Sequence, residues 1–222
     1  PYAGPYTYYL EGKRSSISSF LEGGTHSSTG YAIAKFYNEK EFSDTHGVGT
    51  LDAIIFRYAE VLLIRAEAGA ELGKDPELDL TVNALRKRVG FNVKLTSSPA
   101  TDPKLVAKHP IIKGTNADLI REIRRERRVE LFGEGLRYAD LMRWGCGERL
   151  VAPKAGMMLY TDVYTPEEIA VLKTEVGTYA DGSLDVYGKR VTTPAIFESP
   201  KHYLFSLPLN EMALNPKLKP NN

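Results

Sequence analysis

The sequence predicts a mostly α-helical protein in which helical hairpins support irregular loops and short strands. Three segments carry this prediction. Residues 51–72 are rich in apolar residues and contain no proline, residues 76–89 end at Gly90, and residues 117–132 are densely charged. Proline, glycine, serine and threonine are frequent elsewhere, especially in residues 1–50, which favours loops there.

Composition excludes several classes of protein. The chain has 222 residues, with 42% hydrophobic and 26% charged residues, as in globular proteins. A net charge of +1 argues against binding to nucleic acid. No apolar stretch of about 18 residues is present, so no membrane-spanning helix is predicted. A single cysteine, Cys146, excludes an internal disulfide and a multi-cysteine zinc site.

The distribution of proline, glycine and apolar residues divides the chain into three regions, which we expect to belong to one larger domain. Residues 1–50 form a loop-rich segment with many aromatics, residues 51–147 form helical hairpins, and residues 148–222 form an irregular C-terminal region with short helices. The chain begins at Pro1, with no methionine or signal-like segment. We therefore expect a fragment or processed product whose N-terminal half is missing.

The first hairpin is predicted from two helices joined by a short turn. Residues 51–72 carry apolar residues on most faces, which predicts burial on several sides. Gly73 supplies a stop, and Asp75-Pro76 resembles the cap and first turn of a second helix that ends near residue 89. The hairpin spans about 34 residues, the period of a tetratricopeptide repeat. A generic helical hairpin fits equally well.

Capping residues, prolines and glycines predict the elements that follow the first hairpin. Residues 91–116, with three prolines, are predicted to be a loop. A third helix covers residues 117–132, and a fourth ends at Trp144. Thr165-Pro166 predicts a helix that ends near residue 176. Residues 177–200 are predicted to form turn and strand, and the tail to hold a single helical turn.

The third helix predicts ion pairs between helices. Glu122, Glu126 and Glu130 lie four residues apart, and its arginines show the same spacing. Like charges at this spacing destabilise an isolated helix, so partners on other helices are expected. We predict contacts from the arginines Arg124, Arg125, Arg127 or Arg128 to Glu60 or Glu67, and from Glu126 or Glu130 to an arginine such as Arg57.

No catalytic or metal-binding residue is predicted. The helical carboxylates fit an ion-pair ladder better than acid–base catalysis, which needs carboxylates in different environments within a cleft. The four histidines show no ligand spacing and are interpreted as ordinary surface or loop residues. Cys146 has no histidine near it in sequence and is interpreted as a buried, inert thiol. We expect no enzyme activity, no cofactor and no metal.

Aromatic residues near the N-terminus are the candidate ligand site. The tyrosines Tyr2, Tyr6, Tyr8 and Tyr9 lie among proline and glycine. Tyrosine rings in loops can stack on sugar faces while their hydroxyl groups form hydrogen bonds. The alternative is that these rings cap the helical core.

Four stretches, in order, resemble the C-terminal part of the SusD/RagB family of nutrient-binding lipoproteins. They are Gly30-Tyr31 with Lys35-Phe36-Tyr37, RYAEVLLIRAEA with NALRKRVG, IREIRRERRVELFGEGLRYADLMRWG, and HYLFSLPLNEMALNPKLKPN. Together they cover about residues 30–222. Phe36 stands where the family often has tyrosine, and the lipid-anchor cysteine is not in this sequence.

The resemblance implies a mostly α-helical, SusD-like fold with tetratricopeptide-like hairpins. It also implies a lipid-anchored protein on the extracellular face of the outer membrane. Such a protein binds oligosaccharide, or in some members peptide, and delivers it to a SusC-like TonB-dependent transporter without catalysis. One alternative is a helical-repeat adaptor that binds another protein and no small ligand. Another is a glycoside hydrolase, for which no carboxylate pair in a cleft is found.

Overall fold

The computed structural model describes residues 29, 35, 52, 54–159, 164–187 and 195–220. These residues are mostly α-helical, as predicted, and their only strand-like pairing consists of isolated bridges. They fall into two compact units. The helical unit lies within Lys35–Cys146, and the C-terminal unit comprises Thr29 and the residues from Gly147 onward. No helix in the described ranges is long and apolar enough to cross a membrane.

Helix α2 (Tyr58–Glu71) begins later than predicted. Residues 54–57 are not helical, and Arg57 has an extended backbone with φ −142° and ψ 152°. The predicted start at residue 51 is therefore wrong. The reason is tertiary, because the Arg57 side chain is held by Glu130, the last residue of α5 (Ala117–Glu130), and by Glu134, which follows that helix.

The turn after α2 also differs from the prediction. Asp75 does not open a helix, because its carboxylate accepts a hydrogen bond from the backbone N–H of Glu77 at 2.8 Å and forms a local turn. Helix α3 (Val82–Arg88) starts only after this turn. Pro76 is buried, and its Cα would lie 2.8 Å from a Cβ at Gly69. Glycine at position 69 thus allows the turn to fold back on α2.

Residues 91–116 contain a helix that the sequence interpretation missed. Helix α4 (Pro103–Lys108) is capped by the Asp102 carboxylate, which accepts bonds from two backbone N–H groups. Helix α5 matches the predicted third helix, and α6 (Arg137–Arg143) matches the fourth, with Trp144 at its C-cap.

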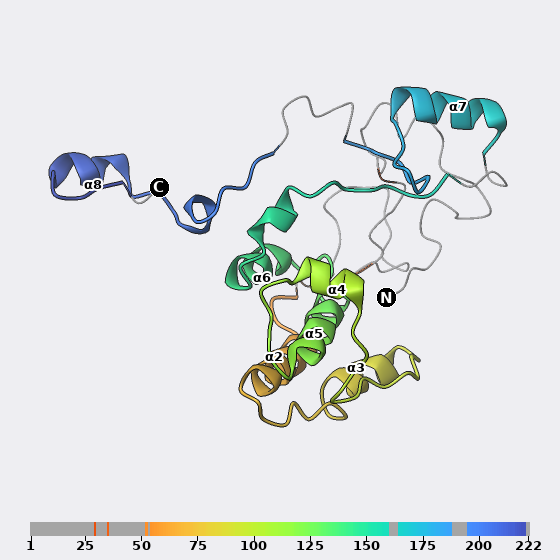
Figure 1. Cartoon of the computed structure of the whole chain (residues 1–222), viewed down its shortest axis with the longest axis horizontal. Helices are drawn as coiled ribbons and strands as arrows, with labels where there is room; N and C mark the ends of the chain where they lie inside the picture. Colours follow the sequence, from red (N-terminus) through yellow and green to blue (C-terminus); the bar gives the residue numbers. More distant parts are fainter. Residues whose placement is uncertain are drawn as a thin grey trace. The chain divides into compact units, whose positions relative to one another are not determined.

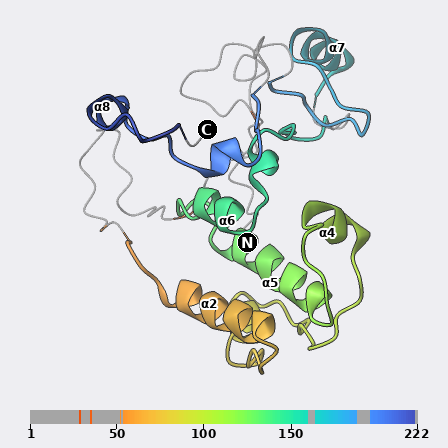
Figure 2. The same cartoon turned by 60° about the vertical axis from the view of Figure 1, so that its left-hand side comes forward.

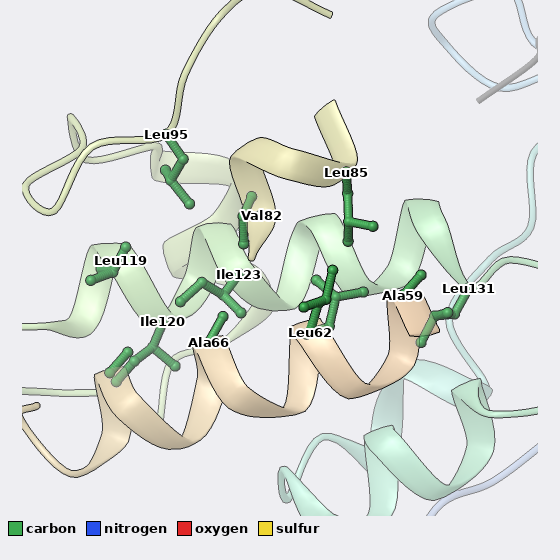
Figure 3. Close-up of a cluster of buried hydrophobic side chains, with 12 residues drawn as sticks. Ala59, Leu62, Ala66, Val82, Leu85, Leu95, Leu119, Ile120, Ile123 and Leu131 are labelled. Atoms are coloured by element: carbon green, nitrogen blue, oxygen red, sulfur yellow. The ribbon is translucent and has the colours of Figure 1, made fainter. Parts of the chain in front are cut away.

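The core of the helical unit lies mainly between α2 and α5, which run side by side and antiparallel (Figures 1 and 2). Asn116, before α5, donates a hydrogen bond to the carbonyl of Ala70 near the end of α2. Figure 3 shows side chains from both helices meeting those of α3. The buried cluster comprises Ala59, Leu62, Leu63, Ala66, Ala70, Val82, Leu85, Leu95, Leu119, Ile120, Ile123 and Leu131.

The outer face of α2 is not covered within the described residues. Tyr58, Val61, Ile64 and Leu72 are 73%, 56%, 51% and 68% exposed. The predicted burial of this helix on several sides is therefore wrong for the described part of the chain. One face is buried against α3 and α5, and the opposite apolar face is open.

The C-terminal unit has its own small core around α7 (Pro166–Glu175). Thr165 and Glu168 form the predicted capping box at its start. Leu172, Val176, Leu184 and Val186 form most of the core. Single bridges join Met158 to Ser183 and Thr178 to Leu184. They represent the predicted strand region.

The described part of the C-terminal unit also contains three short helical elements, one at residue 147 and two after residue 200. These are the 3₁₀ helices η3 (Gly147–Leu150) and η4 (Lys201–Tyr203), and α8 (Leu209–Leu214). The Gly147 N–H donates a hydrogen bond to the Tyr203 hydroxyl at 2.8 Å. A Cβ at position 147 would lie 2.0 Å from the Phe197 ring. The segment around η4 therefore folds directly over this glycine.

Candidate functional site

A buried carboxylate, Glu67 of α2, lies at the centre of a charged cluster in the helical unit. It accepts hydrogen bonds from Arg124 at 3.2 Å, from Arg143 at 2.6 Å and 3.0 Å, and from the Trp144 indole at 2.6 Å. The guanidinium groups of Arg124 and Arg143 lie 4.6 Å and 4.8 Å from the centre of the Trp144 ring. Three helices thus meet at one carboxylate.

The environment keeps Glu67 ionised. Burial opposes ionisation, but hydrogen bonds from Arg143 and Trp144 and the charge of Arg124 outweigh it, so the pKa of Glu67 lies below its ordinary value. A general acid or base near neutral pH needs the opposite shift. Glu67 is therefore suited to holding helices together, not to proton transfer.

Two further charges of α5 are paired across helices in the same way, whereas Arg121 and Arg125 pair with acids of α5 itself. Arg127 donates to Asp140 of α6 at 2.8 Å and lies 3.7 Å from Glu60 of α2. Glu126 accepts a hydrogen bond from Arg86 of α3 at 2.8 Å. These contacts, with those of Glu67, confirm the predicted inter-helix ion pairs.

A second charged cluster joins residues from three of the motif stretches. Arg57 donates hydrogen bonds to Glu130 and Glu134, at 2.7 Å each. Lys35 donates to the Glu130 carbonyl at 2.6 Å and to the Phe132 carbonyl at 3.1 Å, and it also contacts Glu134. The cations satisfy carbonyl groups that the end of α5 leaves free.

Glu134 is the shared anion of this second cluster. Burial opposes its ionisation, but Arg57 and Lys35 together hold the pKa of Glu134 below its ordinary value. The hydrogen bond to Glu134 in turn raises the pKa of Arg57. The cluster holds Lys35 at the C-terminal end of α5, next to Arg57.

Cys146 has a histidine neighbour that the sequence did not reveal. Its Sγ lies 3.6 Å from Nδ1 of His109, which comes 37 residues earlier. Their exposures are 1% and 3%, so His109 is buried, although it lies in a loop, directly after α4, as one of the two predicted alternatives had it. A thiol beside an imidazole is typical of cysteine nucleophiles, but a substrate would need access that burial denies. The predicted buried thiol is confirmed.

Two grooves flank the extended segment after α3. One, of about 540 Å³, is lined by Phe91 together with Asn92, Lys87, Lys94 and Asp79. The other, of about 530 Å³, has no aromatic lining and includes Glu77, Asn83 and Ser97. Arg86 stacks on Phe91 at 5.4 Å. Both volumes lie in the range of small-ligand sites, but a single half-exposed ring offers little stacking surface.

The predicted ligand-binding tyrosines Tyr2, Tyr6, Tyr8 and Tyr9 lie outside the described residues. Among the described residues, no group of three or more histidine, cysteine or acidic side chains could hold a metal ion.

Comparison with known proteins gives a consistent result over nearly the whole chain. The sequence model of the SusD family matches residues 10–222. A SusD-like protein P38 from Formosa agariphila is 36% identical over 104 residues, which are 47% of this chain and 19% of that protein. A crystal structure of a SusD-like carbohydrate-binding protein from Bacteroides fragilis superimposes with a TM-score of 0.61 and 28% identity. The match covers 92% of this chain and 36% of that one, so the chain spans about a third of the solved relative and a fifth of the curated one.

Proposed function

Because the chain belongs to the SusD family, we propose that it is part of a non-catalytic protein that binds oligosaccharide during nutrient uptake. Peptide is the second ligand class. The observation that carries this proposal is the match of the SusD family model to residues 10–222. The solved relative is itself described as a carbohydrate-binding protein.

The charged clusters support binding without catalysis. Each of the carboxylates Glu67, Glu130 and Glu134 is held by arginine or lysine. Glycoside hydrolysis needs one carboxyl group that stays protonated and a second that is ionised, on either side of the scissile bond. A lowered pKa at Glu67 and Glu134 makes neither a suitable acid. These residues serve as the frame that presents a binding surface.

We place the sugar-binding surface at Tyr2, Tyr6, Tyr8 and Tyr9. The support is chemical, because tyrosine rings can stack on pyranose faces and their hydroxyl groups can bond sugar hydroxyls. The described grooves beside α3 offer only Phe91 for stacking. A loop on a rigid helical frame can carry recognition without disturbing the packing beneath it.

The proposal also includes a cellular location and a partner protein. A SusD-family binding protein would act on the extracellular face of the outer membrane, held by a lipid anchor, and would deliver its cargo to a SusC-like TonB-dependent transporter. Co-purification of such a transporter with the tagged full-length protein from its native membrane tests the partnership. Protease digestion of intact cells tests the surface location.

Calorimetry on the full-length protein with a panel of oligosaccharides and peptides tests the ligand class. We expect Tyr6→Ala, Tyr8→Ala or Tyr9→Ala to weaken glycan binding by about 1 kcal/mol for each ring that stacks, roughly fivefold in affinity. The matched control is Phe91→Ala in the groove beside α3, which should leave affinity unchanged. Loss of binding in the control alone would move the site to that groove. Binding of a protein partner and of no glycan would favour the adaptor function.

A further inference from the structure

The segment that follows α3 turns one hydrogen-bonding edge toward the protein. The Phe91 N–H donates to the Arg86 carbonyl at 2.9 Å, and the Val93 carbonyl accepts from the Arg86 guanidinium at 3.0 Å. The side-chain amide of Asn83 accepts from the N–H of Leu95 at 2.7 Å and donates to its carbonyl at 3.1 Å. Residues 91, 93 and 95 therefore all bond to α3.

This alternation is that of a β-strand. In an extended chain the N–H and C=O groups of one residue point to the same side, and those of the next residue point to the opposite side. Asn92, Lys94 and Thr96 thus direct their backbone groups away from α3. All three are exposed, and no hydrogen bond within the described part of the chain reaches those groups. A row of unpaired groups of this kind is a template for a further strand.

Two grooves flank this open edge. The first, of about 540 Å³, is lined by Phe91, Val93 and Lys87, and the second, of about 530 Å³, shares Lys94 and Asp79 with it. Phe91 and Val93 are 51% and 63% exposed, so they offer apolar surface to the side chains of an added strand. Lys94 is paired with Asp79, whereas Lys87 forms no ion pair with any described residue. The charge of Lys87 therefore favours an acidic side chain on the partner.

We propose that residues 91–97 bind an extended peptide segment of a partner protein, rich in apolar residues and carrying an acidic one, by β-strand addition. The backbone groups of residues 92, 94 and 96 pair with the peptide backbone, and the grooves receive its side chains. A sugar lacks the regular row of N–H and C=O groups that this edge complements. The strand site is separate from the tyrosines to which sugar is assigned, so it adds a protein partner to the proposed function.

Lys94→Pro in the full-length protein tests the backbone pairing. Proline has no backbone N–H, and it is tolerated where the N–H of an edge strand faces solvent. The matched control is Lys94→Ala, which removes the same side chain but keeps the N–H group. Both variants should unfold at the urea concentration of the wild type. Thr96→Pro, with Thr96→Ala as its control, repeats the test at the next outward-facing position if Lys94→Pro does not fold.

The probe is a phage-displayed library of random dodecapeptides, selected on the wild-type full-length protein. We expect enriched peptides to carry an acidic residue among alternating apolar residues. Synthetic copies should bind Lys94→Pro at least about 10-fold more weakly than Lys94→Ala, because a hydrogen bond is lost and the proline ring blocks the edge. Lys87→Ala should weaken binding by up to about fivefold, as for an exposed ion pair. Absence of enriched peptides, or equal binding to Lys94→Pro and Lys94→Ala, would overturn the proposal.

Hydrogen exchange with single-residue resolution locates a selected peptide. Strand addition should slow exchange of the Lys94 and Thr96 amides at least about 10-fold, whereas the Leu95 amide, already bonded to Asn83, should change less. A bound peptide that leaves the Lys94 and Thr96 amides unprotected would contradict strand addition. Glycan affinity should be the same in all of these variants, so failure here is distinguishable from failure of the proposed function.

Discussion

Helices α5 and α2 pack against each other, yet they distribute polarity in opposite ways. Helix α5 buries charged side chains, including Arg121, Glu122, Arg124 and Arg127. Helix α2 exposes large apolar ones, including Val61 and Ile64. Both arrangements contradict the expectation that charges lie outside and apolar residues inside. The buried charges of α5 are explained by the side chains that lie across from them.

For α5, the partners are present in the structure. Glu67 and Asp140 accept hydrogen bonds from the buried Arg124 and Arg127 at 2.8–3.2 Å. Glu126 of α5 accepts one from the buried Arg86 of α3 at 2.8 Å. For the outer face of α2, the described residues supply no partner. Within the same helical unit, the charged side chains of α5 therefore contact partners, whereas the outer apolar face of α2 contacts none among the described residues.

The largest effect is expected for Glu67→Gln. It removes the negative charge from a buried carboxylate that binds Arg124, Arg143 and Trp144. Arg124 and Trp144 are buried, and leaving the buried Arg124 without this negative charge should lower the free energy of unfolding by about 3–5 kcal/mol. Urea unfolding of the full-length protein measures this. The control is Glu71→Gln, whose half-exposed carboxylate binds Arg124 alone, and it should cost less than about 1 kcal/mol. Equal costs would contradict a central role for Glu67.

The next effect compares the two faces of α2. Leu63 is fully buried, and Leu63→Ala should cost about 2–5 kcal/mol. If the outer face is covered in the full-length protein, Ile64→Ala should also cost about 2 kcal/mol or more. Val171→Ala on α7 is the control, expected within about 0.5 kcal/mol, as for ordinary surface positions. Ile64→Ala that matches this control would show an outer face in contact with solvent.

The ion pairs between helices could be predicted from the sequence because the like-charge spacing that indicates them lies within a single helix. The like-charge spacing in α5 required partners elsewhere, and Glu67, Glu60 and Arg57 are among them. The capping box of Thr165 and Glu168 was predictable for the same reason, since both residues lie within one turn.

The remaining errors come from contacts that local patterns do not encode. The start of α2 depends on Arg57 reaching Glu130, 73 residues away. Asp75-Pro76 and Asp102-Pro103 look alike in sequence, but only Asp102 caps a helix. At Asp75, Pro76 instead packs against Gly69. The proximity of Cys146 to His109 likewise follows from tertiary folding.

Gly69→Ala tests the close approach by which the turn at Asp75 and Pro76 folds back on α2. Its new Cβ would lie 2.8 Å from Cα of Pro76 and 3.0 Å from the Asp75 carbonyl oxygen, both backbone atoms that cannot rotate away. We expect a loss of about 1–3 kcal/mol in thermal or urea unfolding, as for other overpacked sites. Gly73→Asn is the control, because the space there is open and asparagine tolerates its positive φ of 64°. A neutral Gly69→Ala would show that the turn can move without loss.

The smallest effect, a change of stability with pH, distinguishes two kinds of carboxylate around α5. Arginine and lysine hold the pKa of Glu134 below 4.5 despite its burial, so its contribution is complete above that pH and is lost as the pH falls through the folded pKa. Burial raises the pKa of Glu122 above 4.5 although Arg125 opposes it, so its ionised form lowers stability at neutral pH, and acidification removes that cost. Urea unfolding from neutral pH to about pH 3 should therefore show a slight gain or plateau before the acid loss, since the two shifts have opposite signs. Glu122→Gln should abolish the early gain, and Glu134→Gln should flatten the loss below pH 4.5. A steeper acid loss in Glu122→Gln would mean that the Glu122–Arg125 pair stabilises the fold, like the other charges that α5 buries.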